Sequence, residues 1–236
     1  ARMDISKFGQ IMPKRMAHIM PAPATPPRCD YAANLTAKAL HPKKQYLTVS
    51  KVTPRCGAVQ FTLSADRERG TDKLALFRAG QFLSFRMTIG HSVLTRPYSI
   101  CSAPSDAAKG FYEICVKTAE DGFAGNWICQ NWQVGTKVEA TAPMGEFCYE
   151  ELRDAPAVLG AAGGSGITPF LSMARAIAEG GEDFSLTLLY GSRDSGSILF
   201  KDELDAIAAA CDKVKVVHVL SDEAAEGCEH GVIDAR

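Results

Sequence analysis

Polar and apolar residues alternate along the first two thirds of the chain with the period of two that is typical of β-strands. Six short segments carry the pattern: residues 46–52, 58–63, 82–89, the stretch around Tyr98, 111–117 and 138–142. Turn residues separate these segments, and one helix-like stretch, Phe123–Asn131, interrupts them. The pattern predicts an antiparallel six-stranded β-barrel or a sandwich, over a domain of residues 45–150.

After Asp154 the pattern changes to short, wholly apolar strands that alternate with amphipathic helices. The expected strands are Ala157–Gly160, Leu186–Tyr190 and Val214–Leu220, with one helix in each interval. Such an order is typical of an α/β doubly wound parallel sheet, the usual architecture of nucleotide-binding domains. We therefore expect a second domain over residues 154–236.

Residues 1–44 are expected to form an N-terminal extension. The proline-rich run Pro21–Pro27 favours extended polyproline geometry, whereas Asp4–Ile11 and Ala32–Leu40 could be short helices. This extension could serve as a docking arm for a partner or could wrap the barrel.

Composition and charge exclude several classes of protein. The 236 residues are 46% hydrophobic and 22% charged with a net charge of −1, which favours neither nucleic acid nor an anionic membrane. We expect no membrane span, because no stretch reaches the ~20 continuous apolar residues that a span needs. The eight cysteines form no CxxC pair and the five histidines show no metal spacing, so we expect reduced thiols in a cytoplasmic protein without a metal site.

The glycine-rich segment Gly163–Pro169 lies between a predicted strand and a predicted helix. Such a turn directs backbone N–H groups and the positive end of the helix toward an anion. Gly164 and Gly166 would let a phosphate approach the backbone, Thr168 could add a hydroxyl, and Pro169 suits a first helical turn. The segment predicts a dinucleotide site.

Ser192 and Arg193 follow the second parallel strand, whose carboxyl end lies beside the adenosine ribose in such folds. Serine and arginine there suit the 2′-phosphate of NADPH. Arg193 could equally be a solvated surface arginine, and NADH enzymes can also carry one in this loop, so the choice between NADH and NADPH stays open.

A second candidate site lies on the strand around Tyr98. Arg96, Pro97, Tyr98 and Ser99 place a cation, an aromatic ring and a hydroxyl on one extended segment. With a period of two, Arg96 and Tyr98 share one face and Ser99 the other. Arg96 could neutralise a pyrophosphate and Tyr98 could stack on a planar ring.

The two segments together resemble the ferredoxin–NADP reductase superfamily, and in particular the flavin reductases that feed a plant-type [2Fe–2S] domain. The likeness covers residues 45–236. The supporting segments are Gly80-Gln81-Phe82, Pro143-Met144-Gly145-Glu146-Phe147, Tyr190-Gly191-Ser192-Arg193 and Leu199-Phe200-Lys201-Asp202-Glu203-Leu204.

The resemblance implies roles for individual residues. Arg96 would bind the FAD pyrophosphate, Tyr98 would lie against the flavin ring, and Ser99 would hydrogen-bond near its reactive N5. Gly122–Trp127 matches the second pyrophosphate loop of the family, which usually has a serine where this chain has Gly125; Asn126 or backbone N–H groups would take over its role. The nicotinamide domain of the family continues into a Cys-Gly-Pro segment that this chain lacks before Arg236, so we expect that domain to be incomplete.

The sequence thus predicts a flavin-dependent oxidoreductase. It would pass hydride from NADPH or NADH to FAD and single electrons onward to a [2Fe–2S] ferredoxin or a fused iron–sulfur domain, with Tyr98 and Ser99 at the reacting ring. One alternative is an FAD-holding electron-transfer subunit without its own NAD(P)H oxidation. Another is a nucleotide-binding module without flavin.

Overall fold

The computed structural model describes residues 31–234. The chain divides into a unit of residues 1–37 and a unit of residues 38–236. The expected helix over residues 32–40 is present as α2 (Ala32–Leu40). The expected helix Asp4–Ile11 and the run Pro21–Pro27 lie outside the described residues.

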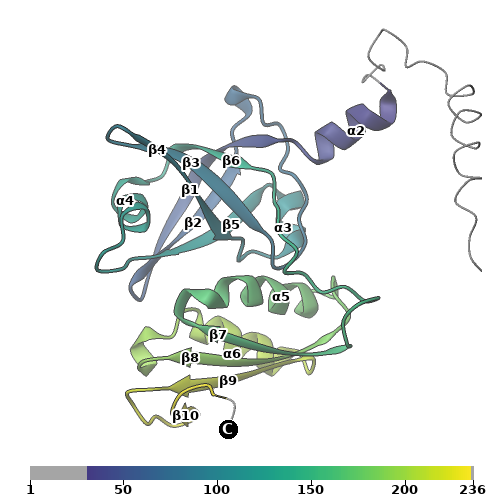
Figure 1. The fold of residues 1–236 in the computed structure, drawn as a ribbon. Coiled ribbons are helices and arrows are strands. Elements are labelled where there is room, and N and C mark those ends of the chain that lie inside the picture. The colour runs from purple at the N-terminus through teal and green to yellow at the C-terminus, as the bar shows by residue number, and fades with distance from the viewer. Residues whose placement is uncertain (1–30, 235–236) are drawn as a thin grey trace, which may run out of the picture. The chain divides into compact units, whose positions relative to one another are not determined.

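Six antiparallel strands form the first sheet (Figure 1). Their order is β4-β3-β6-β1-β2-β5, so β4 and β5 are the two ends. A short bridge between Ile100 and Ile114 joins these ends and curves the sheet into a half-barrel. The strands are β1 (Lys44–Arg55), β2 (Ala58–Ala65), β3 (Phe82–Ile89), β4 (Ser92–Ser99), β5 (Phe111–Lys117) and β6 (Lys137–Thr141).

The apolar residues of the alternating pattern pack on one face of this sheet and form its core. Leu47 and Val49 on β1 and Leu83 and Phe85 on β3 are fully buried, whereas the residues between them are partly exposed. The ring of Phe85 lies 5.3 Å from that of Trp132 in an edge-to-face arrangement, a geometry that stabilises aromatic pairs. The apolar face of each strand therefore forms one continuous core.

Two helices and one 3₁₀ turn connect these strands. Helix α4 (Ala124–Asn131) confirms the helical interruption that the sequence predicts. The turn η2 (Arg67–Arg69) and helix α3 (Pro104–Lys109) were not expected. Helix α3 begins with a proline, and the Asp106 carboxylate accepts a hydrogen bond from the N–H of Ala103 (3.0 Å), which stabilises its first turn.

The second sheet is parallel and has the order β10-β9-β8-β7. Its elements in chain order are β7 (Ala157–Gly163), η3 (Gly164–Ile167), α5 (Thr168–Ala178), β8 (Ser185–Ser192), η4 (Ser195–Ser197), α6 (Lys201–Ala210), β9 (Val214–Leu220) and β10 (Glu229–His230). Leu186, Leu188 and Tyr190 on β8 are buried in one core with residues of α5 and α6. The short strand β10 was not expected. Both sheets confirm the predicted fold class.

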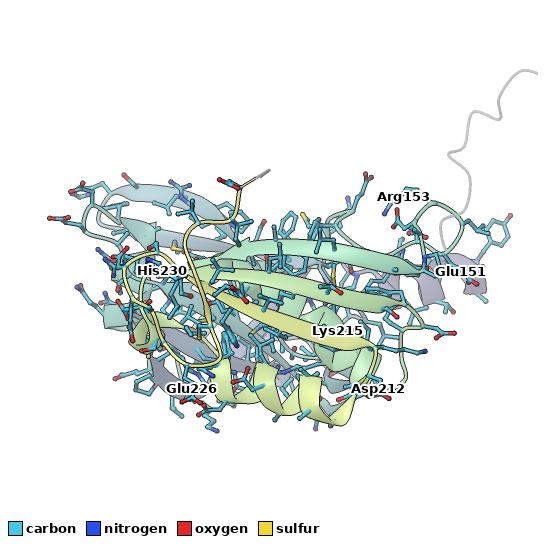
Figure 2. The ribbon with its side chains drawn as sticks, turned by 90° about the horizontal axis from the view of Figure 1, so that it is seen from below. Glu151, Arg153, Asp212, Lys215, Glu226 and His230 are labelled. Atoms are coloured by element: carbon cyan, nitrogen blue, oxygen red, sulfur yellow. The ribbon has the colours of Figure 1, made fainter. Side chains whose placement is uncertain are left out.

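The two ends of the parallel sheet differ in what surrounds them. Figure 2 shows Glu151 and Arg153 of the preceding linker at one end, and Glu226 and His230 at the other.

Strand β7 lies at the edge of the sheet and pairs with β8 alone among the described strands, and its Leu159 side chain is 68% exposed.

A buried histidine, metal sites and membrane spans can be compared in the described residues. His218 is buried on β9, where its Nε2 lies 2.8 Å from Asp205 Oδ1, in keeping with a structural role. Between residues 31 and 234, no side chains are grouped as a metal site, and no helix is both long and apolar enough to cross a bilayer. The seven cysteines in that range are all free thiols.

Candidate functional site

Strand β4 presents its cation and its aromatic ring at the edge of the first sheet. In the β3–β4 register, Arg96 lies opposite Phe85 and Tyr98 opposite Leu83, so Arg96 and Tyr98 share a face as expected. Ser99 lies opposite Phe82 on the other face. Because β4 is an end strand, Arg96 and Pro97 are exposed, while Tyr98 and Ser99 are half-buried.

Tyr98 packs, partly buried, against the core of the first sheet. Its ring centroid is 6.1 Å from that of Phe85, and both rings belong to the core that includes Trp132. Burial raises the pKa of the Tyr98 hydroxyl, Cys129 of α4 adds to this effect, and the positive charge of Arg96 partly offsets it. The hydroxyl therefore stays protonated at neutral pH and can donate a hydrogen bond.

Arg96 keeps its guanidinium available for an anion. Its hydrogen bond goes to the carbonyl oxygen of the adjacent Thr95 (2.9 Å), and among residues 31–234 no carboxylate pairs with it. An exposed, unneutralised cation beside a half-exposed aromatic ring suits a cofactor that carries both a pyrophosphate and a planar ring. The residues of β4 therefore fit FAD.

The loop before α4 is stabilised by Asn126. Its Oδ1 accepts a hydrogen bond from the N–H of Ala119 (3.1 Å), and its Nδ2 donates to the Ala119 carbonyl (2.7 Å). A β-carbon at Gly122 would lie 3.1 Å from Asn126 Oδ1, and one at Gly125 would lie 3.1 Å from the Lys117 carbonyl. The side chain of Asn126 thus shapes the loop rather than reaching toward a phosphate.

Little space surrounds position 125 at the start of helix α4. A β-carbon there would make a tight contact with the carbonyl oxygen at the end of β5. Trp127, which follows in α4, donates its N–H to Phe123, and the earlier N–H groups of the first turn have no intrahelical acceptor. These groups carry the positive end of the helix dipole.

A pocket of about 540 Å³ lies at the carboxyl ends of the parallel strands. The strand register brings Gly163 beside Gly191, and Ser192 beside Leu220, so the ends of β7, β8 and β9 meet there. This edge is where doubly wound sheets bind nucleotides. The pocket is lined by Lys117, Ala161, Ala162, Gly163, Gly164, Gly191, Ser192, Arg193, Ser197, Val219, Ser221, Gly231, Val232 and Ile233.

The glycine-rich turn adopts a conformation that requires glycine at one position. Gly164 has φ of 50°, in the left-handed region, and a β-carbon on it would lie 3.0 Å from Lys117 Nζ. Gly166 follows in η3, and Pro169 lies in the first turn of α5. Thr168 is buried and its hydroxyl donates to the Ser165 carbonyl (3.0 Å), so it stabilises the turn itself.

Ser192 and Arg193 both line this pocket. Within the described residues, Ser192 Oγ is buried without a hydrogen-bond partner, which is costly unless a ligand or water satisfies it. Arg193 is exposed, and its carbonyl accepts the N–H of Asp222, which fixes the backbone while leaving the guanidinium in solvent. An unsatisfied hydroxyl beside a cation suits a phosphorylated sugar.

The structure adds residues to the pocket that sequence reasoning missed. Lys117 comes from β5 of the first sheet, and Ser221 follows β9. The position of Ser221 after a predicted parallel strand was a usable signal, because strand ends meet at one edge. Lys117 carried no such signal, because its contact with the Gly164 turn depends on how the two sheets pack.

Two family matches, one over each sheet, define the class of protein as an oxidoreductase with a flavin-binding and a nicotinamide-binding part. Residues 51–149 match the family described as oxidoreductase FAD-binding domain. Residues 161–236 match the family described as oxidoreductase NAD-binding domain. The chain therefore carries both cofactor-binding domains.

Individual relatives agree with these matches. The ferredoxin reductase component of the 3-ketosteroid-9-alpha-monooxygenase of Mycobacterium tuberculosis is 42% identical over 148 residues, which are 61% of this chain and 39% of the relative. Ferredoxin–NADP reductase B of Sorangium cellulosum is 32% identical over 161 residues, 68% of this chain and 64% of the relative. The chain belongs to the ferredoxin–NADP reductase superfamily.

A solved structure gives the same result. Phthalate dioxygenase reductase, described as a modular structure for electron transfer from pyridine nucleotides to [2Fe–2S], has a TM-score of 0.62 and 29% identity. The match covers 74% of this chain and 51% of that one. The chain spans between 39% and 49% of the 3-ketosteroid-9-alpha-monooxygenase reductase components that it matches.

Proposed function

We propose that the chain is the flavin- and nicotinamide-binding part of a reductase that oxidises NADPH or NADH and passes single electrons to an iron–sulfur centre. The observation that carries the proposal is the presence of two complementary sites in one chain: the exposed Arg96–Ser99 strand, and the pocket at the carboxyl edge of the parallel sheet. FAD, when bound, supplies the chemistry that accepts a hydride and releases electrons one at a time.

The residues of the first sheet hold and orient the flavin in this proposal. The Arg96 guanidinium and the first-turn N–H groups of α4, with Gly122, Gly125 and Asn126 shaping the loop, neutralise the pyrophosphate. Pro97 fixes the local backbone, and Trp127 packs on the core beneath the loop. Tyr98 lies along the ring, and Ser99 is the hydrogen-bond partner near N5.

The residues of the second sheet bind the nucleotide. The N–H groups of the turn with Gly164 and Gly166, in front of Thr168 and Pro169, face the pyrophosphate, and Lys117 adds a positive charge from the first sheet. Ser192 and Arg193 would then lie beside the adenosine ribose of the nucleotide. Together their hydroxyl and guanidinium favour the 2′-phosphate of NADPH.

The electron acceptor is proposed from chemistry and from relatives. The relatives include reductase components of oxygenases, and phthalate dioxygenase reductase passes electrons to [2Fe–2S]. A [2Fe–2S] ferredoxin or fused iron–sulfur domain is the matching partner here. The free thiols between residues 31 and 234 support a cytoplasmic location for this chain. The proposed domain boundaries are 1–44 for the N-terminal extension, 45–150 for the FAD-binding domain and 154–236 for the NAD(P)-binding domain.

An anaerobic titration tests the proposal. The purified chain, loaded with FAD, is mixed with NADPH or NADH while absorbance near 450 nm, the flavin band, is recorded. Bleaching by either nucleotide is expected. A yellow protein that neither nucleotide bleaches, but that a chemical reductant does, would show that the chain holds FAD without oxidising NAD(P)H. A chain that never retains FAD would refute the flavin site.

Nucleotide choice is tested with Arg193→Ala. Because Arg193 is exposed, solvent and salt weaken its contact, and we expect NADPH to bind roughly 5- to 30-fold more weakly at low salt, with NADH changed less than about twofold. Arg67→Ala, which removes an exposed arginine from η2 in the other domain, is the control. Equal weakening of both nucleotides would exclude a 2′-phosphate contact.

A further inference from the structure

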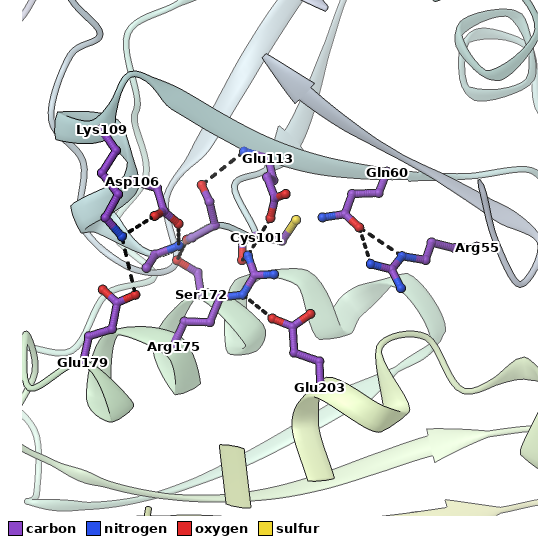
Figure 3. A network of polar contacts seen from close by, with 12 residues as sticks. Arg55, Gln60, Cys101, Asp106, Lys109, Glu113, Ser172, Arg175, Glu179 and Glu203 are labelled. Carbon is purple, nitrogen blue, oxygen red and sulfur yellow. Dashed lines mark hydrogen bonds and ion pairs between the residues drawn. The ribbon is translucent and has the colours of Figure 1, made fainter. Parts of the chain in front are cut away.

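The guanidinium of Arg175 lies between the two sheets, and its side chain is only 16% exposed. It comes from α5, whose first turn follows the glycine-rich turn. Its Nη1 donates to Glu113 Oε2 of β5 (2.7 Å) and to the Cys101 carbonyl (2.8 Å), while its Nε donates to Glu203 Oε1 of α6 (2.6 Å). Figure 3 shows this arrangement, with one carboxylate from each domain on the same cation.

The electrostatics of this contact favour a fixed geometry. Burial opposes the charge on Arg175, but the hydrogen bond and attraction of Glu203, together with Cys101 and Glu113, raise the pKa of the guanidinium above its ordinary value. Glu113 and Glu203 are 18% and 33% exposed, so solvent screens them only in part. Charge-assisted hydrogen bonds in such surroundings are short and directional.

A second contact joins helix α5 to the segment that follows β4, one helical turn before Arg175. The buried hydroxyl of Ser172 on α5 donates to the Ser102 carbonyl (2.7 Å), and Ser102 Oγ in turn accepts the N–H of Glu113 (3.1 Å). Ser102 is three residues beyond Ser99, and Ser172 is four residues beyond Thr168. Four residues of helix rise only about 6 Å, so the contact lies close to both candidate cofactor sites along the backbone.

We propose that Arg175 and Ser172 are positioning residues that set the placement of the nucleotide-binding turn relative to the flavin strand. The inference rests on the function proposed above. Hydride transfer requires reacting atoms about 3–3.5 Å apart, and a misplacement of about 1 Å can lower the rate on the order of a hundredfold. Both residues hold the carbonyls of Cys101 and Ser102, which continue directly from β4. Neither residue lines the nucleotide pocket or belongs to the Arg96–Ser99 strand.

The two carboxylates on Arg175 offer a matched pair of variants. Glu113→Gln weakens the contact between domains, whereas Glu203→Gln weakens a contact within the parallel-sheet domain. Other contacts between the domains are untouched in both variants, among them the Ser172–Ser102 hydrogen bond and the guanidinium of Arg55, 4.8 Å from the ring centroid of Phe200. Stopped-flow bleaching by NADPH or NADH is expected to slow on the order of tenfold or more in Glu113→Gln and less than about threefold in Glu203→Gln. Dissociation constants for FAD and nucleotide should stay within about twofold in both.

A measurement without cofactors separates positioning from chemistry. Residual dipolar couplings of the apo chain report the relative orientation of the two domains. We expect Glu113→Gln and Ser172→Ala to change this orientation or to broaden its distribution, with each domain's internal couplings unchanged, and Glu203→Gln to match the wild type. Arg175→Lys, which keeps the charge but loses the planar fork, should recover part of the bleaching rate that Arg175→Ala loses.

The outcomes are distinct. Equal bleaching rates and equal domain orientation in Glu113→Gln and wild type would overturn the positioning role. A slower rate that is fully accounted for by weaker nucleotide binding would overturn it as well. A wild-type chain that never bleaches would instead refute the proposed function, and the dipolar couplings would still decide whether these contacts orient the domains.

Discussion

Replacing Gly80 with alanine places a methyl group where the backbone of another segment already lies. A β-carbon at Gly80 would be 1.8 Å from the Phe147 carbonyl oxygen and 2.8 Å from Met173 Cε. Gly80 also has φ of 98°, which disfavours any side chain. The substitution therefore combines backbone strain with a collision between the turn that precedes β3 and the segment that follows β6.

A second glycine separates these two effects. Gly110, which ends α3, has φ of 100°, but a β-carbon on it meets nothing within 4 Å. Strain of about 1–2 kcal/mol, less about 0.4–1 kcal/mol gained by restricting the unfolded chain, gives a net cost of about 1 kcal/mol for Gly110→Ala. Gly80→Ala adds about 2–3 kcal/mol of overpacking, because the atom in the way is a backbone oxygen rather than a flexible side chain.

Thermal unfolding of the two variants measures the difference. At about 2–4 °C per kcal/mol for a chain of this size, Gly80→Ala should melt roughly 4–12 °C below Gly110→Ala. Gly80→Ala should also bind FAD more weakly, because Phe82, two residues on, pairs with Ser99. Equal melting temperatures in the two variants would refute the reasoning, since they would show that Phe147 moves aside without cost.

Two further predictions concern the flavin loop and the buried thiols. Asn126→Ala should weaken FAD binding about 5- to 10-fold in a fluorescence-quenching titration, because binding must then order the loop that the Ala119 contacts now fix. Asn131→Ala, which removes one hydrogen bond at the far end of the same helix, is the control, and equal effects would contradict the assignment. Burial raises the pKa of Cys115 from 9.0 to about 12, so the native state favours the neutral thiol, and stability that is complete below pH 9 should be lost as pH rises from about 9 toward 12. Urea midpoints should therefore fall less steeply above pH 9 in Cys115→Ala than in wild type or in the exposed-site control Cys56→Ala, and parallel curves would contradict this.

Sequence patterns predicted the strands well because each strand buries one face. The alternation at residues 46–52 reports the burial of Leu47 and Val49, and it does not depend on distant parts of the chain. Helix α3 was missed because its six residues are too few to show a helical period. Strand β10 was missed because its two exposed residues are a strand only through their register with β9.

The candidate sites likewise contain residues that a local sequence pattern reveals and residues that it does not. Arg96–Ser99 and the glycine-rich turn are local motifs, and their types and spacing are visible in the sequence. The pocket contact of Lys117 and the interdomain contacts of Arg175 depend on how the two sheets pack, which no local pattern encodes. The sequence left the role of the missing serine to Asn126 or to backbone N–H groups, and only the structure shows that the Asn126 side chain is engaged by the Ala119 backbone.

Among the strands of residues 31–234, β7 lies at the edge of the parallel sheet, and this has a consequence for handling the 236-residue chain. An edge strand presents unpaired backbone N–H and C=O groups that can pair with another molecule, and the 68% exposed Leu159 adds an apolar contact to that surface. The chain carries a net charge of only −1, so long-range repulsion between copies is weak. Self-association through β7 would bring a second copy to the strand that leads into the glycine-rich turn, and protein concentration is therefore a variable that every nucleotide titration of this chain has to control.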